Sequence, residues 1–278
     1  MTKLKSWLLA AALILNLNIP SKPAAEERFA SLESRVRFKV AFFAGHSDVK
    51  EAYGALSAVK ISENCYNDAI LERIGRYRAS PVYGFESMLF YSDKHISLQE
   101  RPILAEESQA NIYVEIHHDS GSLKNIKNKR WRNMEGFSVY FPSEDMEGNP
   151  NIFKEESEKL ALCIGKEIKQ AGFKPSDYYT ARSEENGKTI FSADFGVYSA
   201  RFDVLKNAKM PAVLVECGNI VNPYEEKLMQ DPGAQMMISE AIMRGISSYL
   251  ASYRKHCDDL LMQSLKALSF RRMARLRQ

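Results

Sequence analysis

The chain has 278 residues, of which 45% are hydrophobic and 26% are charged, a composition that allows one buried core of ordinary domain size. This balance excludes a fibrous or mainly disordered protein. The formal net charge of +3 is too small over this length to make nucleic acid the main partner. We therefore expect no binding to nucleic acid.

Residues 1–25 have the pattern of a targeting segment. Two lysines precede a short apolar run from Trp7 to Leu15, and prolines and alanines follow it. A positive start, a short apolar centre and a small-residue end are typical of a secretory signal peptide. The run is shorter than the roughly 20 residues that span a bilayer, although an uncleaved N-terminal anchor or an internal helix is the alternative. In both cases we expect an exported protein, periplasmic or secreted, with residues 26–34 as a linker.

Residues 35–253 alternate between strand and helix patterns and are expected to form the main folded domain. Periods of two and of 3.6 residues, together with turn residues, distinguish these segments. The predicted strands are 35–43, 87–91, 112–116, 137–141 and 211–216, and the predicted helices are 62–77, 97–109, 153–171, 223–229 and 235–253. Strands that alternate with helices predict a single α/β domain, with a twisted, mainly parallel or mixed sheet and helices on both faces.

Two segments near the C-terminal end of the chain have more than one interpretation. Residues 178–203 are polar and aromatic, which suits either a substrate-facing loop or an ordinary surface loop. Residues 254–278 are basic, with leucines between the arginines and lysines. That pattern fits a basic amphipathic helix in peripheral contact with a membrane or with another anionic surface. A solvated helical or frayed tail is the interpretation that we favour.

Three of the four cysteines lie in apolar periodic segments. They are Cys65, Cys163 and Cys217, and we expect buried thiols at these positions. The wide spacing of the cysteines predicts no particular disulfide.

Three predicted strands end at residues that can bind a metal or act as a base. His46 follows the first strand, His117 follows a middle strand and Glu216 ends the last one. Ligands of an open α/β sheet gather beyond the carboxyl ends of its strands, so these side chains should share one crevice. Glu63, at the start of a predicted helix, could face the same crevice.

This group has the composition of a hydrolytic metal site. Two imidazoles and a carboxylate are the usual ligand set of a hydrolytic zinc, and a second carboxylate is needed as a base for the attacking water. Glu216 is the natural candidate for that base, because a carboxylate that ends an apolar run is costly to bury without a partner. Taken singly, the other residues have ordinary structural interpretations, and the spacing alone does not name the metal.

Five short motifs follow one another in an order that is specific to one family. They are Gly45-His46, Ser62-Glu63-Asn64, Ser97 to Arg101, Glu115 to Asp119, and Pro211 to Gly218. Through these motifs the chain resembles the zinc-dependent N-acetylmuramoyl-L-alanine amidases, the third amidase family of cell-wall hydrolases, over roughly residues 36–249. The resemblance implies an enzyme that hydrolyses the amide bond between N-acetylmuramic acid and L-alanine in peptidoglycan.

The resemblance also implies a role for each residue of the predicted site. His46, Glu63 and His117 would bind zinc, and Glu216 would be the catalytic base and later the proton donor to the leaving amine. His118 is a rival to His117, but strand alternation puts the two on opposite sides, and the family motif favours His117. Asp119 either orients a ligand or is a solvated loop residue.

Two other functions remain open on the sequence alone. Another zinc amidohydrolase or carboxypeptidase would act on a small acyl-amino acid or a peptide, and would need a closed pocket with an arginine for a free carboxylate. A wall-binding module without activity would lack one of the ligands. We expect peptidoglycan as the substrate, and the sequence leaves open whether a protein activator is required.

Overall fold

The computed structural model describes residues 38–49, 52–78, 80–120, 134–143, 152–176 and 188–275. The signal peptide and linker predicted for residues 1–34 lie outside these ranges, as does part of the loop expected at 178–203. Residues 38–249 form one compact unit, and the chain from Leu250 onward belongs to a second one. The functional residues predicted from the sequence all fall in the first unit.

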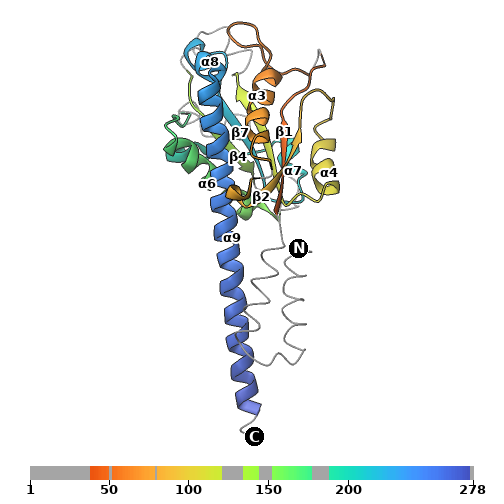
Figure 1. The fold of residues 1–278 in the computed structure, drawn as a ribbon, viewed down its shortest axis with the longest axis vertical. Coiled ribbons are helices and arrows are strands. Elements are labelled where there is room, and N and C mark those ends of the chain that lie inside the picture. Colours follow the sequence, from red (N-terminus) through yellow and green to blue (C-terminus); the bar gives the residue numbers. More distant parts are fainter. Residues whose placement is uncertain are drawn as a thin grey trace. The chain divides into compact units, whose positions relative to one another are not determined.

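A seven-stranded mixed sheet is the centre of the first unit (Figure 1). Its strand order is β2-β1-β3-β7-β4-β6-β5. β2, β1, β3 and β7 are parallel neighbours, β4 runs antiparallel to β7, and β5 runs antiparallel to β6. The strands are β1 (Phe38–Ala44), β2 (Phe85–Phe90), β3 (Ile112–Asp119), β4 (Ser138–Pro142), β5 (Thr189–Ser192), β6 (Val197–Ala200) and β7 (Ala212–Asn219). The predicted α/β fold with a mixed sheet is confirmed.

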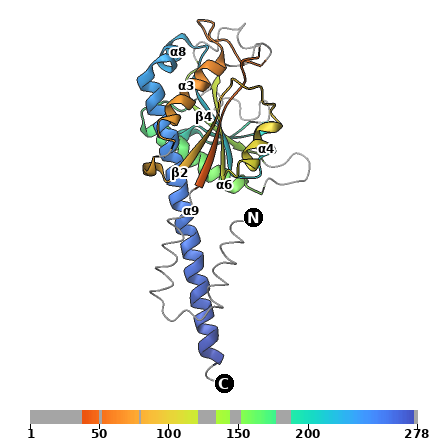
Figure 2. The same cartoon turned by 45° about the vertical axis from the view of Figure 1, so that its right-hand side comes forward.

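Helices cover both faces of this sheet (Figure 2). On one face lie α3 (Glu63–Gly75), α6 (Lys154–Gln170) and the first part of α9 (Pro232–Arg275). They pack against each other as well as against the sheet: the Ser239 hydroxyl of α9 donates to the carbonyl of Ile70 in α3. On the other face lie α4 (Glu100–Glu107) and α7 (Asp203–Lys206), whose apolar side chains join the core around β3 and β4.

The two-sided cover explains the sequence pattern of the central strands. Because both faces are buried, β1 and the first parts of β3 and β7 are mostly apolar and do not alternate between apolar and polar residues. Side chains still alternate in direction. In β3, Tyr113 faces the core cluster that includes α4, whereas His118 faces α3. This alternation decides which residues of β3 can join a site on either face.

Several short helices and turns connect the strands of the sheet. α8 (Pro223–Gln230) follows β7, and the Asn222 side chain caps it by accepting from the backbone N–H of Tyr224 at 3.0 Å. Two 3-10 turns, η1 (Pro81–Tyr83) and η4 (Ala193–Phe195), precede β2 and β6. α4 begins with reciprocal hydrogen bonds between Ser97 and Glu100, which is a capping box.

The last helix continues through the basic segment that follows it. The sequence pattern predicted a helix over 235–253 and a helical or frayed segment after it, and α9 runs without interruption from Pro232 to Arg275. No glycine or proline occurs after Gly245 within α9, so nothing in the backbone chemistry stops the helix where the apolar pattern weakens. Among the described residues, no helix is both long and apolar enough to cross a membrane.

Smaller differences concern strand ends and cysteines. β3 and β7 extend three residues beyond their predicted ends at 116 and 216, so His117 and Glu216 lie within strands. Ser62 precedes α3, but its side chain makes no capping hydrogen bond. Cys217 is buried as predicted and Cys163 is half-buried, whereas Cys65 is exposed, contrary to the prediction.

Candidate metal centre

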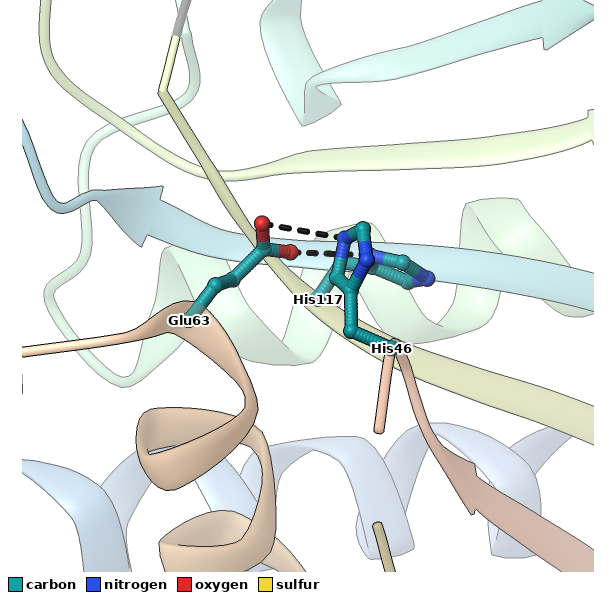
Figure 3. A group of neighbouring side chains, drawn as sticks. All are labelled: His46, Glu63 and His117. Atoms are coloured by element: carbon teal, nitrogen blue, oxygen red, sulfur yellow. Dashed lines mark hydrogen bonds and ion pairs between the residues drawn. The ribbon is translucent and has the colours of Figure 1, made fainter. Parts of the chain in front are cut away.

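Three predicted ligands meet at the carboxyl ends of β1 and β3 and the start of α3 (Figure 3). The carboxylate of Glu63 faces both imidazoles, with one oxygen directed at each ring. Its Oε2 is 3.0 Å from Nε2 of His46, and its Oε1 is 2.9 Å from Nδ1 of His117. One donor atom from each residue lies within 4.8 Å of the other two. The three side chains therefore form a group that could hold a metal ion.

The backbone around His46 is shaped to bring these side chains together. His46 itself has a φ of 66°, a left-handed conformation that costs a non-glycine residue about 1–3 kcal/mol. Gly54, at a φ of 79°, passes so close that a Cβ there would lie 2.6 Å from both Glu63 Oε2 and His46 Cδ2. A Cβ on Gly45 would lie 2.3 Å from the ring of His117. The site is therefore packed against glycine backbone on two sides.

Glu216 is positioned directly beside this group. It is the register partner of His117 on the neighbouring strand β7, so the two side chains point toward the same face of the sheet. Its Oε2 is buried and has no hydrogen-bond partner among the described residues. Burial raises the pKa of Glu216 to about 8, and the negative charge of Asp119 adds to the rise.

The pKa values of Glu63 and His117 are shifted in the opposite directions from those that burial alone would cause, because these two side chains are paired with opposite charges. Burial alone would raise the pKa of Glu63, but the hydrogen bonds and charges of His117 and His46 hold it well below its ordinary value. Burial would lower the pKa of His117, but hydrogen bonds to Glu115 and Glu63 outweigh it and raise the pKa to about 10. The carboxylates of Glu63 and Glu115 therefore favour a positive charge at this position, carried by either a proton or a metal ion.

His118, the rival to His117, lies on the other face of the sheet. Its Nδ1 is 2.8 Å from Oδ1 of Asn67 in α3, and its ring packs against Tyr66. Burial lowers the pKa of His118 to about 3, so the ring is neutral. Asn67 in turn donates to the carbonyl of Gly45 at 3.0 Å. His118 is placed to support the loop that carries His46 and does not point at the His46–Glu63–His117 group.

Two buried charges near the site were not assigned a role from the sequence. Glu115 in β3 is fully buried, and its Oε1 accepts from Arg101 of α4 at 2.6 Å. The same oxygen is 3.3 Å from Nε2 of His117. The signal that could have revealed Glu115 is a carboxylate inside an apolar strand, two residues before a ligand and on the same face.

Arg101 also bears on the alternative functions. Its guanidinium donates to Glu115 and to the carbonyls of Ala44 and His46. These hydrogen bonds use the guanidinium of Arg101 inside the protein, so it is not available to bind the free carboxylate of a small substrate.

The fold and the site together define a class of protein. An α/β sheet with two imidazoles and a carboxylate at its carboxyl edge, beside a second carboxylate, has the architecture and donor set that a metal-dependent hydrolase uses. The family model for N-acetylmuramoyl-L-alanine amidase matches residues 40–248. The chain belongs to this family.

Individual relatives agree with this assignment. A probable cell wall amidase, LytH, of Staphylococcus epidermidis is 24% identical over 161 residues, which are 58% of this chain and 41% of the relative. The chain thus spans about two fifths of that relative's length. A putative N-acetylmuramoyl-L-alanine amidase of Buchnera aphidicola is 25% identical and is matched over 95% of its length and 76% of this chain.

A solved structure supports the same family at the level of the fold. The catalytic domain of CwlV, an N-acetylmuramoyl-L-alanine amidase from Bacillus (Paenibacillus) polymyxa, superimposes with a TM-score of 0.58 at 25% identity. The match covers 77% of this chain and 98% of that domain.

Proposed function

We propose that this protein is a zinc-dependent amidase that hydrolyses the bond between N-acetylmuramic acid and L-alanine in peptidoglycan. The family of the chain supports the substrate and the bond. The observation that carries the chemistry is the buried, unpartnered oxygen of Glu216 beside the His46–Glu63–His117 group. An unpartnered carboxylate next to a metal-binding group is typical of a general base that deprotonates the attacking water.

The residues fit zinc by the chemistry of their donors. His46, Glu63 and His117 would hold the ion, and two nitrogens and one carboxylate are the ligands of a catalytic zinc site with one position left open. The backbone at Gly45 and Gly54 leaves no room for a Cβ near these ligands. When bound, zinc would polarise the amide carbonyl and make a water molecule more acidic.

Glu216 performs the proton transfers in this proposal. Its carboxylate accepts a proton from the attacking water, and the protonated acid then donates that proton to the departing nitrogen of L-alanine. A raised pKa, about 8 without a metal, suits a group that must both take and release a proton near neutral pH.

The test uses intact peptidoglycan and the purified protein from about residue 30 onward, with Glu216→Gln as the conservative variant. We expect release of stem peptides that begin with L-alanine, identified by mass spectrometry. Chelation should abolish release and added zinc should restore it, whereas Glu216→Gln should bind zinc and release at least 100-fold less product. Products cut at any other bond would refute the proposal.

The matched control is Glu226→Gln. Glu226 is also a buried carboxylate, but its hydrogen bonds go to Tyr66 and to the backbone of Val59. Peptide release by this variant should stay close to that of the parent protein. A parent protein that binds zinc but releases no peptide would indicate that an activating protein is required.

The proposal also includes the location of the enzyme. Peptidoglycan lies outside the cytoplasmic membrane, so the segment at residues 1–25 would direct export to the periplasm or the medium. The arginines and lysines near the C-terminal end, within α9 and beyond it, would allow peripheral contact with anionic lipid or wall polymers. Binding to anionic vesicles that is lost when residues 254–278 are removed would support that contact.

A further inference from the structure

A buried ion pair lies directly behind one of the proposed zinc ligands. Glu115 and Arg101 are 0% and 3% exposed, and Arg101 donates to Glu115 Oε1 at 2.6 Å. Glu115 Oε2 accepts from the hydroxyl of Tyr113, two residues earlier in β3. The carboxylate is therefore fixed in orientation by a donor on each oxygen.

This fixed carboxylate faces the ring of His117. Glu115 and His117 are two residues apart in β3, so their side chains project from the same face of the sheet. Oε1 of Glu115 is 3.3 Å from Nε2 of His117, whereas Nδ1 of the same ring faces Glu63 at 2.9 Å. Both carboxylates accept only, so each faces a ring N–H of His117 in the metal-free site. A histidine that binds a metal must release one ring proton; because Glu115 would keep the proton on Nε2, the nitrogen that would become free is Nδ1, on the side where Glu63 and His46 meet.

The side chain of Arg101 also contacts the backbone of His46, the other imidazole ligand. Arg101 donates to the carbonyl of His46 at 2.6 Å and to the carbonyl of Ala44 at 3.0 Å. These bonds hold the turn in which His46 takes its left-handed conformation. One ion pair therefore contacts both histidines of the site, at the ring of one and at the backbone of the other.

We infer that Glu115, held by Arg101, is a positioning residue that sets the tautomer and orientation of His117 for zinc binding. The inference rests on the proposed function, since it requires the three-residue group to bind zinc. It assigns a role to Glu115, a carboxylate that neither binds the metal nor touches the substrate in the proposed function. A carboxylate behind a histidine ligand strengthens metal binding by fixing the ring and increasing its basicity.

The experiment measures zinc affinity by competition with a chelator of known affinity, independently of catalysis. Glu115→Gln keeps the shape but removes the charge, and we expect it to weaken zinc binding about 10–100-fold. The double variant Arg101→Gln/Glu115→Gln leaves no unpaired buried charge, so it serves if the single variant does not fold. The control is Glu226→Gln, a buried carboxylate bonded to Tyr66 and to no histidine.

Thermal unfolding of the metal-free variants separates positioning from a merely structural role. Glu115→Gln and Glu226→Gln should both lower the unfolding temperature, but only Glu115→Gln should weaken zinc binding. The visible absorption bands of the cobalt-substituted protein should also change in Glu115→Gln, because they report ligand geometry. Unchanged zinc affinity in the single or the double variant, or an equal loss in Glu226→Gln, would overturn the inference. A parent protein that binds no zinc would overturn the proposed function as well.

Discussion

Replacing Gly45 with alanine should inactivate the protein without unfolding it. A Cβ at this position would lie 2.3 Å from Cε1 and Nε2 of His117 and 2.6 Å from Cδ2. The backbone of Gly45 is outside the left-handed region, so alanine can adopt it without strain. The conflict is therefore entirely with the imidazole ring.

The size of the effect follows from this overlap. Ordinary contacts between carbon atoms are about 3.5–4.0 Å, so the ring of His117 must move by about 1 Å. The ring is the end of a side chain and can yield, but it loses its position between Glu63 and Glu115. A displacement of about 1 Å in a reacting group costs roughly 100-fold in rate, which is about 2.7 kcal/mol of transition-state stabilisation.

The assay compares Gly45→Ala with Gly172→Ala. Gly172 has a φ of 97°, and a Cβ there would meet no heavy atom within 4 Å. Alanine at Gly172 should cost about 1–3 kcal/mol of folding free energy through backbone strain and leave peptide release from peptidoglycan unchanged. Gly45→Ala should show the opposite, with activity reduced about 100-fold and thermal unfolding nearly unchanged.

A single result would refute this reasoning. If Gly45→Ala kept more than about a tenth of the parent activity, a shift of His117 by about 1 Å would not matter to the chemistry. The role of His117 as a ligand at this position would then be wrong. Loss of folding in Gly45→Ala would instead show that the ring cannot yield.

Three further predictions concern the charges around the site. Arg101→Met should lower the free energy of unfolding by about 3–5 kcal/mol, measured by urea denaturation, because it strands the buried carboxylate of Glu115; a loss below about 1 kcal/mol would contradict the pairing. The acidic limb of the pH–activity profile should fall at a pH below 8, because activity requires ionised Glu216, whose pKa of about 8 is lowered by a bound cation. A limb at higher pH, or one that persists in Glu216→Gln, would exclude this assignment. His118→Gln should retain zinc while His117→Gln loses it, as measured by metal content after gel filtration, and the reverse would make His118 the ligand.

Much of the fold was determined by local sequence patterns. The apolar runs of β1, β3 and β7 predicted a sheet buried on both faces, and the helical periods of α3 and α6 located its cover. The end of α9 could not be predicted in this way, because helix-forming residues continue where the apolar stripe of a packed helix fades.

Part of the candidate site could likewise be predicted from the sequence, and part of it could not. Motif order points to His46, Glu63, His117 and Glu216, and strand alternation places His117 and His118 on opposite sides of the strand. The pairing of Glu115 with Arg101 is different, since the two residues come from a strand and a helix that meet only in the folded chain. Which buried charges find partners depends on distances between elements, and these are set by tertiary packing alone.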